Sequence, residues 1–297
     1  MSIRFDGRVA IVTGAGGGLG RRYALDLAAR GARLVVNDLG GARDGTGGSV
    51  SAAQAVVDEI VAAGGEAVAN GASVTDAAAV QAMVDETVAR WGKVDILINN
   101  AGILRDKSFT KMSLEDFRFV VEVHLMGSVN CTKAVWDGMR ANNYGRILMT
   151  TSSTGLYGNF GQTNYGAAKA ALTGFMKSLY LEGAKNNVHV NTIAPLAATR
   201  MTEDLMPAEL LAKMGPETVS PAALYLVSEG APTNVILNAG GGGFERAYVT
   251  ITRGVHAGAE DLTPEFVAAQ FDAISSWDGM VEPANGSGQG AMALSRG

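Results

Sequence analysis

The chain has 297 residues, of which 47% are apolar, so it can bury the core of one large domain or two small ones. Its formal net charge is −5 and its basic residues form no blocks, which argues against a nucleic acid as a partner. No stretch approaches 18 consecutive apolar residues, so the sequence predicts no membrane span and no membrane partner.

The termini and the cysteine content bear on location. Cys131 is the only cysteine, which rules out an intramolecular disulfide and favours a reducing compartment. Only the short apolar run Val9–Val12 follows the charged N-terminus, so no signal peptide is predicted. Residues 295–297 differ from the peroxisomal Ser-Lys-Leu address. We therefore expect a cytoplasmic protein.

A strand, a glycine-rich turn and a helix are predicted in succession over residues 8–30. This arrangement presents backbone N–H groups and a helix N-terminus to a phosphate. Gly14 would permit the sharp turn, Gly18 and Leu19 would approach a pyrophosphate, and Gly20 would let helix and strand pack closely. The glycine spacing is a variant of the dinucleotide fingerprint, so a merely glycine-rich loop is the alternative.

Asp38 follows the predicted second strand, residues 33–37. A carboxylate about twenty positions after a glycine loop is placed to accept hydrogen bonds from a ribose 2′-OH, and it repels the 2′-phosphate of NADP. This pattern predicts NAD as the cofactor, unless Asp38 simply caps the next element. Ser73 and Val74, after the third strand, are expected near the adenine ring.

The fourth predicted strand, residues 94–98, is continuously apolar and ends in Asn-Asn-Ala-Gly over 99–102. Small and amide residues at this end of a strand fit a ligand crevice, although Asn and Gly also favour turns. Asn99, Ala101 and Gly102 are therefore candidate cofactor residues. Residues 114–142 predict one long helix, softly interrupted at its glycines.

Three residues around the fifth strand suggest proton-transfer chemistry. Ser152 ends that strand and lies thirteen residues before Tyr165, which opens a predicted helix with Lys169 four positions on. Helical i,i+4 spacing places the phenol and the amine on one face, and a nearby cation favours the phenolate. The three could move a proton to or from an alcohol or carbonyl oxygen. The alternative is that Tyr165 and Lys169 are only surface neighbours.

The remainder of the chain is less regular. Pro195 closes the sixth strand, and residues 196–217 carry three methionines that suit a mobile lid over an apolar substrate, or an ordinary amphipathic insertion. We expect a Rossmann-type α/β domain with a doubly wound, seven-stranded parallel sheet over residues 1–243. Residues 244–297 would form an extension that is disordered from about residue 282.

The glycine loop, the Asn-Asn-Ala-Gly turn and the Ser152–Tyr165–Lys169 set together resemble the short-chain dehydrogenase/reductase family over residues 8–238. The resemblance implies that Ser152 orients the substrate oxygen and that Tyr165 is the acid/base. It also implies that Lys169 binds the nicotinamide ribose and lowers the tyrosine pKa. The glycines would hold the pyrophosphate of NAD, Asp38 would select that cofactor, and no metal is implied.

Longer stretches resemble, within that family, the (3R)-hydroxyacyl-CoA dehydrogenase domains of multifunctional β-oxidation enzymes type 2, which are also described as 17β-hydroxysteroid dehydrogenases. The resemblance implies a homodimer or homotetramer that pairs through the long helix and the Tyr165 helix. The stretches that carry it are FDGRVAIVTGAGGGLGR, VVNDLGG, NNAGILRDKSF, VHLMGS, YGRILMTTSSTGLYGNFGQTNY and NTIAPLAATRMT.

The chain departs from the family pattern at several positions. His124 stands where many members have an Asn that holds a proton-relaying water, and an imidazole could hold the same water; a satisfied interior His is the alternative. Ser73 replaces the usual Asp near the adenine ring. Pro195 is followed by Leu rather than Gly, while Thr199 is retained and could hold the carboxamide.

Three functions remain open at this point. The first is NAD-dependent oxidation of a (3R)-hydroxyacyl-CoA, for which Arg105 and Lys107 could meet the CoA phosphates unless they are solvated loop charges. The second is oxidation of a 17β-hydroxysteroid, which needs an apolar slot and no basic rim. The third is a non-catalytic NAD-binding regulator or scaffold, which the intact Ser152–Tyr165–Lys169 set disfavours.

Overall fold

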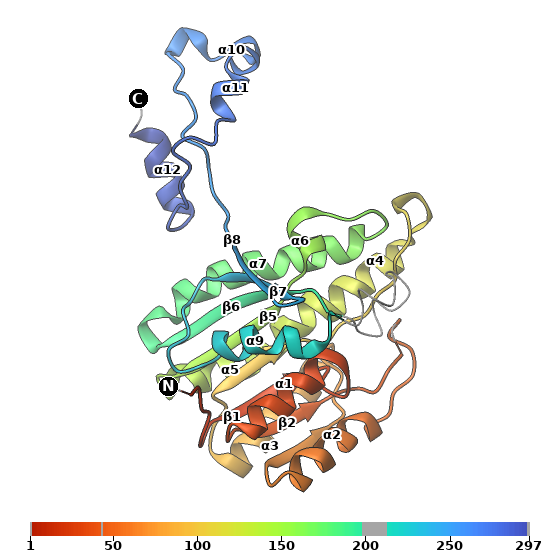
Figure 1. Cartoon of the computed structure of the whole chain (residues 1–297). Coiled ribbons are helices and arrows are strands. Elements are labelled where there is room, and N and C mark those ends of the chain that lie inside the picture. Colours follow the sequence, from red (N-terminus) through yellow and green to blue (C-terminus); the bar gives the residue numbers. More distant parts are fainter. Residues whose placement is uncertain (1, 43, 198–212, 296–297) are drawn as a thin grey trace. The chain divides into compact units, whose positions relative to one another are not determined.

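The computed structural model describes residues 2–42, 44–197 and 213–295. The chain divides into two compact units, Met1–Arg246 and Ala247–Gly297, which are described separately below. The first unit carries the sheet and the helices that cover it (Figure 1).

The first unit is built around a sheet with the strand order β3-β2-β1-β4-β5-β6-β7-β8. All six pairings from β3 to β7 are parallel, which confirms the predicted seven parallel strands and the doubly wound α/β fold. The strands are β1 (Val9–Thr13), β2 (Arg33–Asn37), β3 (Glu66–Asn70), β4 (Ile96–Asn99), β5 (Gly145–Thr150), β6 (Val188–Pro195), β7 (Ile236–Gly240) and β8 (Gly243–Ala247).

Strand β8 is an addition to the predicted sheet. Only Gly241 and Gly242 separate it from β7, and both have positive φ values, +58° and +87°. Two-residue hairpin turns favour such φ values, which glycine adopts without strain. Gly241 and Gly242 therefore form the turn of a hairpin.

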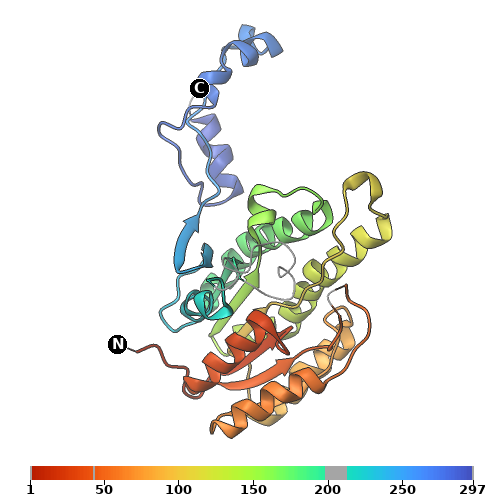
Figure 2. The ribbon, with the colours of Figure 1, turned by 45° about the vertical axis from the view of Figure 1, so that its right-hand side comes forward.

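Helices cover both faces of the sheet, as its continuously buried strands require. One apolar cluster joins β1 and β2 to α1 (Gly18–Ala29), α2 (Ser51–Ala62) and α9 (Ser220–Leu226). The opposite face carries α3 (Ala77–Trp91), α5 (Gly127–Ala141) and α7 (Thr163–Gly183) (Figures 1 and 2). The strand order reverses between β1 and β4, and ligands of such sheets bind at that point, beyond the carboxyl ends of the strands.

The helix predicted over residues 114–142 is interrupted in the structure. It consists of α4 (Leu114–Val121), one π-helical turn (Glu122–Met126) and α5. The interruption falls at the turn that contains His124, and not at Gly127 or Gly138 as expected from the sequence. Single π-turns inside α-helices frequently occur at functional sites.

The second unit contains the bridge between Ile251 and Val281 and the helices α10 (Pro264–Ala269), α11 (Phe271–Ile274) and α12 (Gly286–Leu294). Disorder was expected from residue 282, and α12 differs from that expectation. The Asn285 side chain caps this helix by accepting a hydrogen bond from the Gly288 N–H at 2.8 Å. Within the described part of the chain, no helix has both the length and the apolar character to cross a membrane.

Candidate active site

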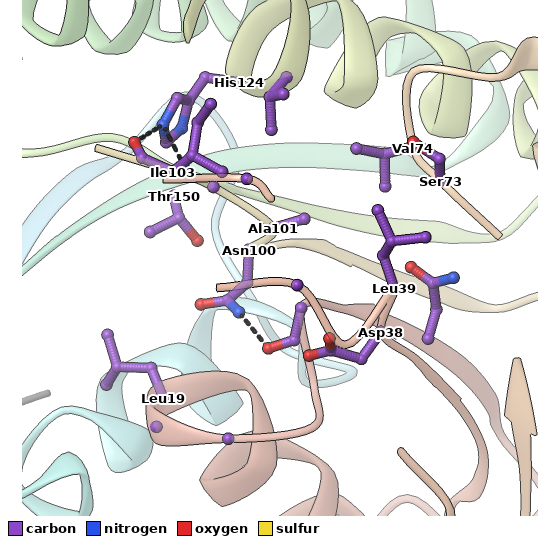
Figure 3. A pocket seen from close by; sticks show the side chains of 18 of the residues that line it. Leu19, Asp38, Leu39, Ser73, Val74, Asn100, Ala101, Ile103, His124 and Thr150 are labelled. Carbon is purple, nitrogen blue, oxygen red and sulfur yellow. Dashed lines mark hydrogen bonds between the residues drawn. The ribbon is translucent and has the colours of Figure 1, made fainter. Parts of the chain in front are cut away.

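A cavity of about 290 Å³ lies at the carboxyl ends of the strands, where the sheet order reverses (Figure 3). Most of the predicted site residues line this single cavity, although they are spread over almost the whole first unit. Those that line it are Gly14, Gly18, Leu19, Asp38, Ser73, Val74, Ala101, Gly102, His124, Tyr165, Lys169 and Pro195.

Four predicted residues are placed differently. Gly20, Asn99 and Ser152 do not line the cavity, and Thr199 lies outside the described residues. Most of the predicted lid over residues 196–217 also lies outside the described part, although Met214 within it is buried. Asn99 faces the sheet and α5, where its amide donates a hydrogen bond to the Thr132 hydroxyl at 3.2 Å.

The glycine loop between β1 and α1 packs too closely against its neighbours for larger residues. Gly14 has a φ of +63°, and a Cβ atom there would lie 2.8 Å from the Ala101 Cα. A Cβ on Gly20 would lie 2.3 Å from the Gly14 carbonyl oxygen. Gly18 is the first residue of α1, so the helix N-terminus opens directly onto the cavity. The loop therefore offers backbone N–H groups in the geometry that suits a phosphate.

Asn100 is a site residue that the sequence analysis passed over in favour of Asn99. Its side-chain amide donates to the carbonyl oxygens of Thr13 and Gly14, at 2.9 and 3.1 Å. The Thr13 hydroxyl in turn accepts from the N–H groups of Asn100 and Ala101, at 3.0 and 3.1 Å. These bonds pin the glycine loop to the end of β4 (Figure 3). The signal available in the sequence was the position of Asn100 directly before the two small residues of the turn, Ala101 and Gly102.

The Asp38 carboxylate lies between two loops. One oxygen accepts from the Gly16 N–H at 2.7 Å, and the other accepts from the Gly40 N–H at 2.6 Å. Each oxygen has a further lone pair for a ligand. Among the described residues that line the cavity, Lys169 is the one basic residue, and no group of His, Cys, Asp and Glu in the described part could hold a metal ion.

Tyr165 lies in the first turn of α7, next to the Ser152 hydroxyl. Burial raises the pKa of the phenol to about 12, while a hydrogen bond with Ser152 opposes the rise. Ser152 caps α6 (Ser153–Tyr157), where its hydroxyl accepts from the Thr154 N–H at 3.1 Å. The cap fixes the serine hydroxyl at the edge of the phenol.

Lys169 is 3% exposed, and its Nζ donates to the Thr150 carbonyl oxygen at 2.6 Å. Burial lowers the pKa of this amine to about 7. The Nζ lies 5.5 Å from the centre of the Tyr165 ring. Burial is the largest cause of the pKa shift in both groups, so the pKa of the phenol is raised in the absence of a cofactor, and its lowering by Lys169 stays a prediction.

His124 is 1% exposed, and its ring meets the Tyr165 ring edge-on, with 5.2 Å between ring centres. Its Nε2 lies 3.1 Å from the Ile103 amide nitrogen and 2.8 Å from the Ile103 carbonyl oxygen, while its Nδ1 has no partner in the described structure (Figure 3). Burial, and then the charge of Lys169, hold the pKa of the imidazole well below its usual value. The ring is therefore neutral at pH 7.

Gly102 makes room for that imidazole. A Cβ atom on Gly102 would lie 2.2 Å from the His124 Cε1, closer than any real Cβ contact. The sequence showed Gly102 only as part of a turn, so this constraint between β4 and the π-turn became visible only in three dimensions.

A doubly wound sheet with a glycine loop and a cavity at the carboxyl ends of its strands is the architecture of dinucleotide-binding proteins. Residues 8–210 match the family model described as short chain dehydrogenase. The chain belongs to that family and is an oxidoreductase that acts on CH–OH groups.

Individual relatives and solved structures agree with this family assignment. The chain is 47% identical over 288 residues to the peroxisomal multifunctional enzyme A of Dictyostelium discoideum, covering 97% of this chain and 64% of that protein. Full-length peroxisomal multifunctional enzyme type 2 from Drosophila melanogaster superposes with a TM-score of 0.82 and 36% identity, over 99% of this chain and 50% of that one. A 7α-hydroxysteroid dehydrogenase complexed with NADH and 7-oxo-glycochenodeoxycholic acid matches with a TM-score of 0.73 and 34% identity, over 81% and 95% of the two chains.

These matches correct the expected location, and they limit how far the activities of the relatives can be assigned to this chain. The expected cytoplasmic location is wrong, because the relatives from Dictyostelium, Drosophila, mouse, yeast and Neurospora are all named as peroxisomal. The chain spans between 25% and 64% of the length of those relatives. Their activities as whole proteins therefore enter only as proposals.

Proposed function

We propose that this protein is an NAD-dependent dehydrogenase that oxidises (3R)-hydroxyacyl-CoA to 3-ketoacyl-CoA. The observation that carries the reaction type is the partly buried Tyr165, which lies beside Ser152, Lys169 and His124 at one end of the cavity. The substrate class rests on the resemblance to the multifunctional β-oxidation enzymes. An NAD-binding regulator would have no need of a buried acid/base set, which disfavours the non-catalytic alternative.

The residues that line the cavity fit NAD. The glycine loop, with Gly18 and Leu19 at the start of α1, would hold the pyrophosphate, and Asp38 would hold the adenosine ribose. Ser73 and Val74, which also line the cavity, would pack against the adenine. The Asp38 carboxylate in the lining, which would repel a 2′-phosphate, supports NAD over NADP. Ala101, Gly102 and Pro195 line the remaining length, and the solved relative with NADH supports a nicotinamide cofactor.

NAD would supply the hydride acceptor and a positive charge beside Tyr165. The Tyr165 phenolate takes the proton from the substrate hydroxyl, and Ser152 donates a hydrogen bond to the oxygen as negative charge develops on it. Burial alone keeps the phenol protonated near neutral pH. Protonated Lys169 therefore has a defined task, which is to stabilise the phenolate while the amine is anchored on the Thr150 carbonyl.

We assign His124 to the proton path. Its Nδ1 is buried and has no partner in the described structure, while Nε2 is fixed by Ile103. A neutral imidazole held in this way can position a water molecule between Lys169 and the solvent, which is the role that the family gives to an Asn. Asn99 would act by tying β4 to α5 through its hydrogen bond to Thr132, and Gly20 would act by allowing close packing of the glycine loop.

A hydroxysteroid is the second candidate substrate. Arg105 and Lys107, the expected contacts for CoA phosphates, both bind Asp116, at 3.0 and 2.8 Å. Neither is therefore available as a free cation in the structure. A 34%-identical structure is a 7α-hydroxysteroid dehydrogenase, which supports this alternative.

A substrate panel tests both candidates. Reduction of NAD is followed by absorbance with (3R)-hydroxyacyl-CoA of short, medium and long chain, with the (3S) isomers as stereochemical controls, and with 17β- and 7α-hydroxysteroids. We expect turnover with (3R)-hydroxyacyl-CoA only. Turnover of steroids alone would overturn the substrate, and no NADH with any alcohol would overturn the dehydrogenase assignment.

We further propose that residues 1–243 form the catalytic domain and that the protein is a homo-oligomer paired through α5 and α7. Every described residue of the site belongs to the first compact unit, which supports the domain assignment. Sedimentation at micromolar concentration tests the assembly, since a monomer would contradict it.

A further inference from the structure

The loop between β2 and α2, residues 39–49, crosses one end of the cavity, and we call it the strap; its residue 43 lies outside the described part. It is the orange loop that leaves the sheet in Figures 1 and 2. Leu39, Gly41, Ala42 and Gly45 of the strap line the cavity. Its base is closed by a hydrogen bond from the Ser49 N–H to the Leu39 carbonyl at 2.8 Å.

The tip of the strap rests on the opposite wall. Gly45 has a φ of +87°, and a Cβ atom there would lie 2.9 Å from the Phe119 Cε1 and 3.3 Å from the Ile103 Cγ2. Phe119 belongs to α4, and Ile103 follows the Asn-Asn-Ala-Gly turn; both line the same cavity. The strap therefore spans the adenosine end of the cavity from β2 to α4.

Arg105 fastens the strap to that wall. Its Nε donates to the Asp44 carbonyl oxygen at 3.1 Å, and its guanidinium lies over the Phe119 ring, 4.3 Å from the ring centre. Its Nη1 donates to the Asp116 carboxylate at 3.0 Å. In the described part of the chain, no other hydrogen bond joins the strap to α4 or to the segment before it.

Two features make Arg105 suited to this task. A planar guanidinium can stack face-on against an aromatic ring while its N–H groups donate within its plane, a geometry that the tetrahedral ammonium of a lysine does not reproduce. Its backbone is held separately, because the Asn164 side chain donates to the Arg105 carbonyl at 3.0 Å. The Asp116 anchor is also independent of the strap, since Lys107 and the Ser113 hydroxyl help to hold the pKa of its carboxyl below the usual value.

We propose that Arg105 is a positioning residue that fastens the strap over the adenosine end of the cofactor site and thereby slows cofactor release. This inference rests on the proposed NAD-binding function. Arg105 acts through the strap, so it controls binding and release of the dinucleotide and leaves the proton transfer at Tyr165 unchanged.

Lys107 provides the matched control. It binds the same Asp116 carboxylate at 2.8 Å, but in the described structure it makes no contact with the strap. Arg105→Met and Lys107→Met each remove one positive charge beside Asp116, and only the first removes the bond to the Asp44 carbonyl and the stacking on Phe119.

The experiment measures NADH dissociation by stopped-flow fluorescence and hydrogen exchange of the strap amides. For Arg105→Met we expect NADH release to accelerate about tenfold, as loss of a charged hydrogen bond and a stacked cation implies, with faster exchange over residues 40–48. The KM for NAD should rise, while the single-turnover rate at saturating NAD stays within twofold of wild type. Lys107→Met should match wild type in all of these.

Equal release rates for wild type and Arg105→Met, or the same acceleration in Lys107→Met, would overturn the proposal. If Arg105→Met does not fold, Gly45→Ala serves as the second variant, because its Cβ would displace the strap from Phe119 and should also speed release. A wild-type protein that binds no NADH would instead contradict the proposed function, so the two failures are distinguishable.

Discussion

The two ends of the cavity are built from different materials. At the phosphate and adenosine end, the contacts come from backbone N–H groups, glycines without side chains and one carboxylate that is already bonded to two amides. At the catalytic end, the side chains of His124 and Lys169 are buried and that of Tyr165 is partly buried, and desolvation shifts the pKa of each in the direction that favours its neutral form.

This difference explains what each end can do. Backbone groups hold their charge distribution at every pH, so the first end is suited to binding a dinucleotide of constant charge. Desolvation favours the neutral forms of the groups at the second end, so a positive charge on Lys169 or on a bound nicotinamide ring has a large effect on the proton of Tyr165. Binding and chemistry are thus separated along one cavity.

Loss of the Tyr165 hydroxyl should have the largest effect, because it removes the chemistry and leaves cofactor binding in place. Tyr165→Phe should reduce turnover by about 10²–10⁴-fold, the usual contribution of a positioned acid/base, while the Kd for NADH changes little. Initial rates and a fluorescence titration measure the two quantities. Tyr225→Phe is the control, because Tyr225 is half exposed on α9, away from the cavity lining. Retention of more than a few per cent of the wild-type rate would show that Tyr165 is not the acid/base.

A methyl group on Gly102 should disturb the catalytic end through packing. Gly102→Ala places a Cβ 2.2 Å from the His124 Cε1, and His124 is confined by Ile103 and Tyr165. We expect a loss of about 1–3 kcal/mol in the free energy of unfolding, as for other overpacked cores, together with lower turnover.

The matched control for this change is Gly138→Ala. Gly138 lies in α5, and a Cβ there would meet nothing within 4 Å. Its replacement should stabilise the protein by up to about 1 kcal/mol through helix propensity. Chemical unfolding of both variants measures the difference, and equal stabilities would show that the Gly102 contact relaxes without cost.

The sequence was most informative where function depends on local spacing. The parallel sheet followed from alternating apolar strands and helices, and Tyr165 and Lys169 followed from one helical turn. Gly14, Gly18 and Asp38 could also be assigned to one cavity, because they directly follow two neighbouring parallel strands, β1 and β2.

The sequence was least informative where residues distant along the chain meet. Asn99 and Asn100 are neighbouring residues with the same side chain, so the sequence does not show which of them faces the site. The register of β4 against β1 and β5 directs Asn99 into the core and Asn100 toward the glycine loop. Arg105 looked like a substrate contact because its partners, Asp44 and Asp116, lie on other segments. The raised pKa of Tyr165 likewise depends on burial that spacing does not encode.

The burial of Lys169 can be measured as a pH dependence of stability. Its pKa is about 7 in the folded protein against an ordinary value of 10.5, so between these values the unfolded chain binds more protons and the free energy of unfolding rises with pH. Relative to Lys169→Met, wild type should gain up to about 1.4 kcal/mol per pH unit between pH 7 and 9. The raised pKa of Tyr165 acts only above pH 10, with the opposite sign. Parallel stability curves from urea unfolding would show that Lys169 is not desolvated.

The smallest expected effect is on cofactor preference, and it comes from removing the charge of Asp38 at the adenosine end. Asp38→Asn keeps the shape of the side chain but removes the charge, and it replaces one of the two acceptors that hold Gly16 and Gly40. The ratio of kcat/KM for NAD to that for NADP should fall about tenfold, since one unfavourable charge pair near the surface is worth on the order of 1 kcal/mol. Asp58→Asn, on the exposed face of α2, is the control. If the ratio is unchanged while both cofactors bind more weakly, Asp38 serves only to hold the two loops together. Cofactor choice would then be set by the shape of the cavity.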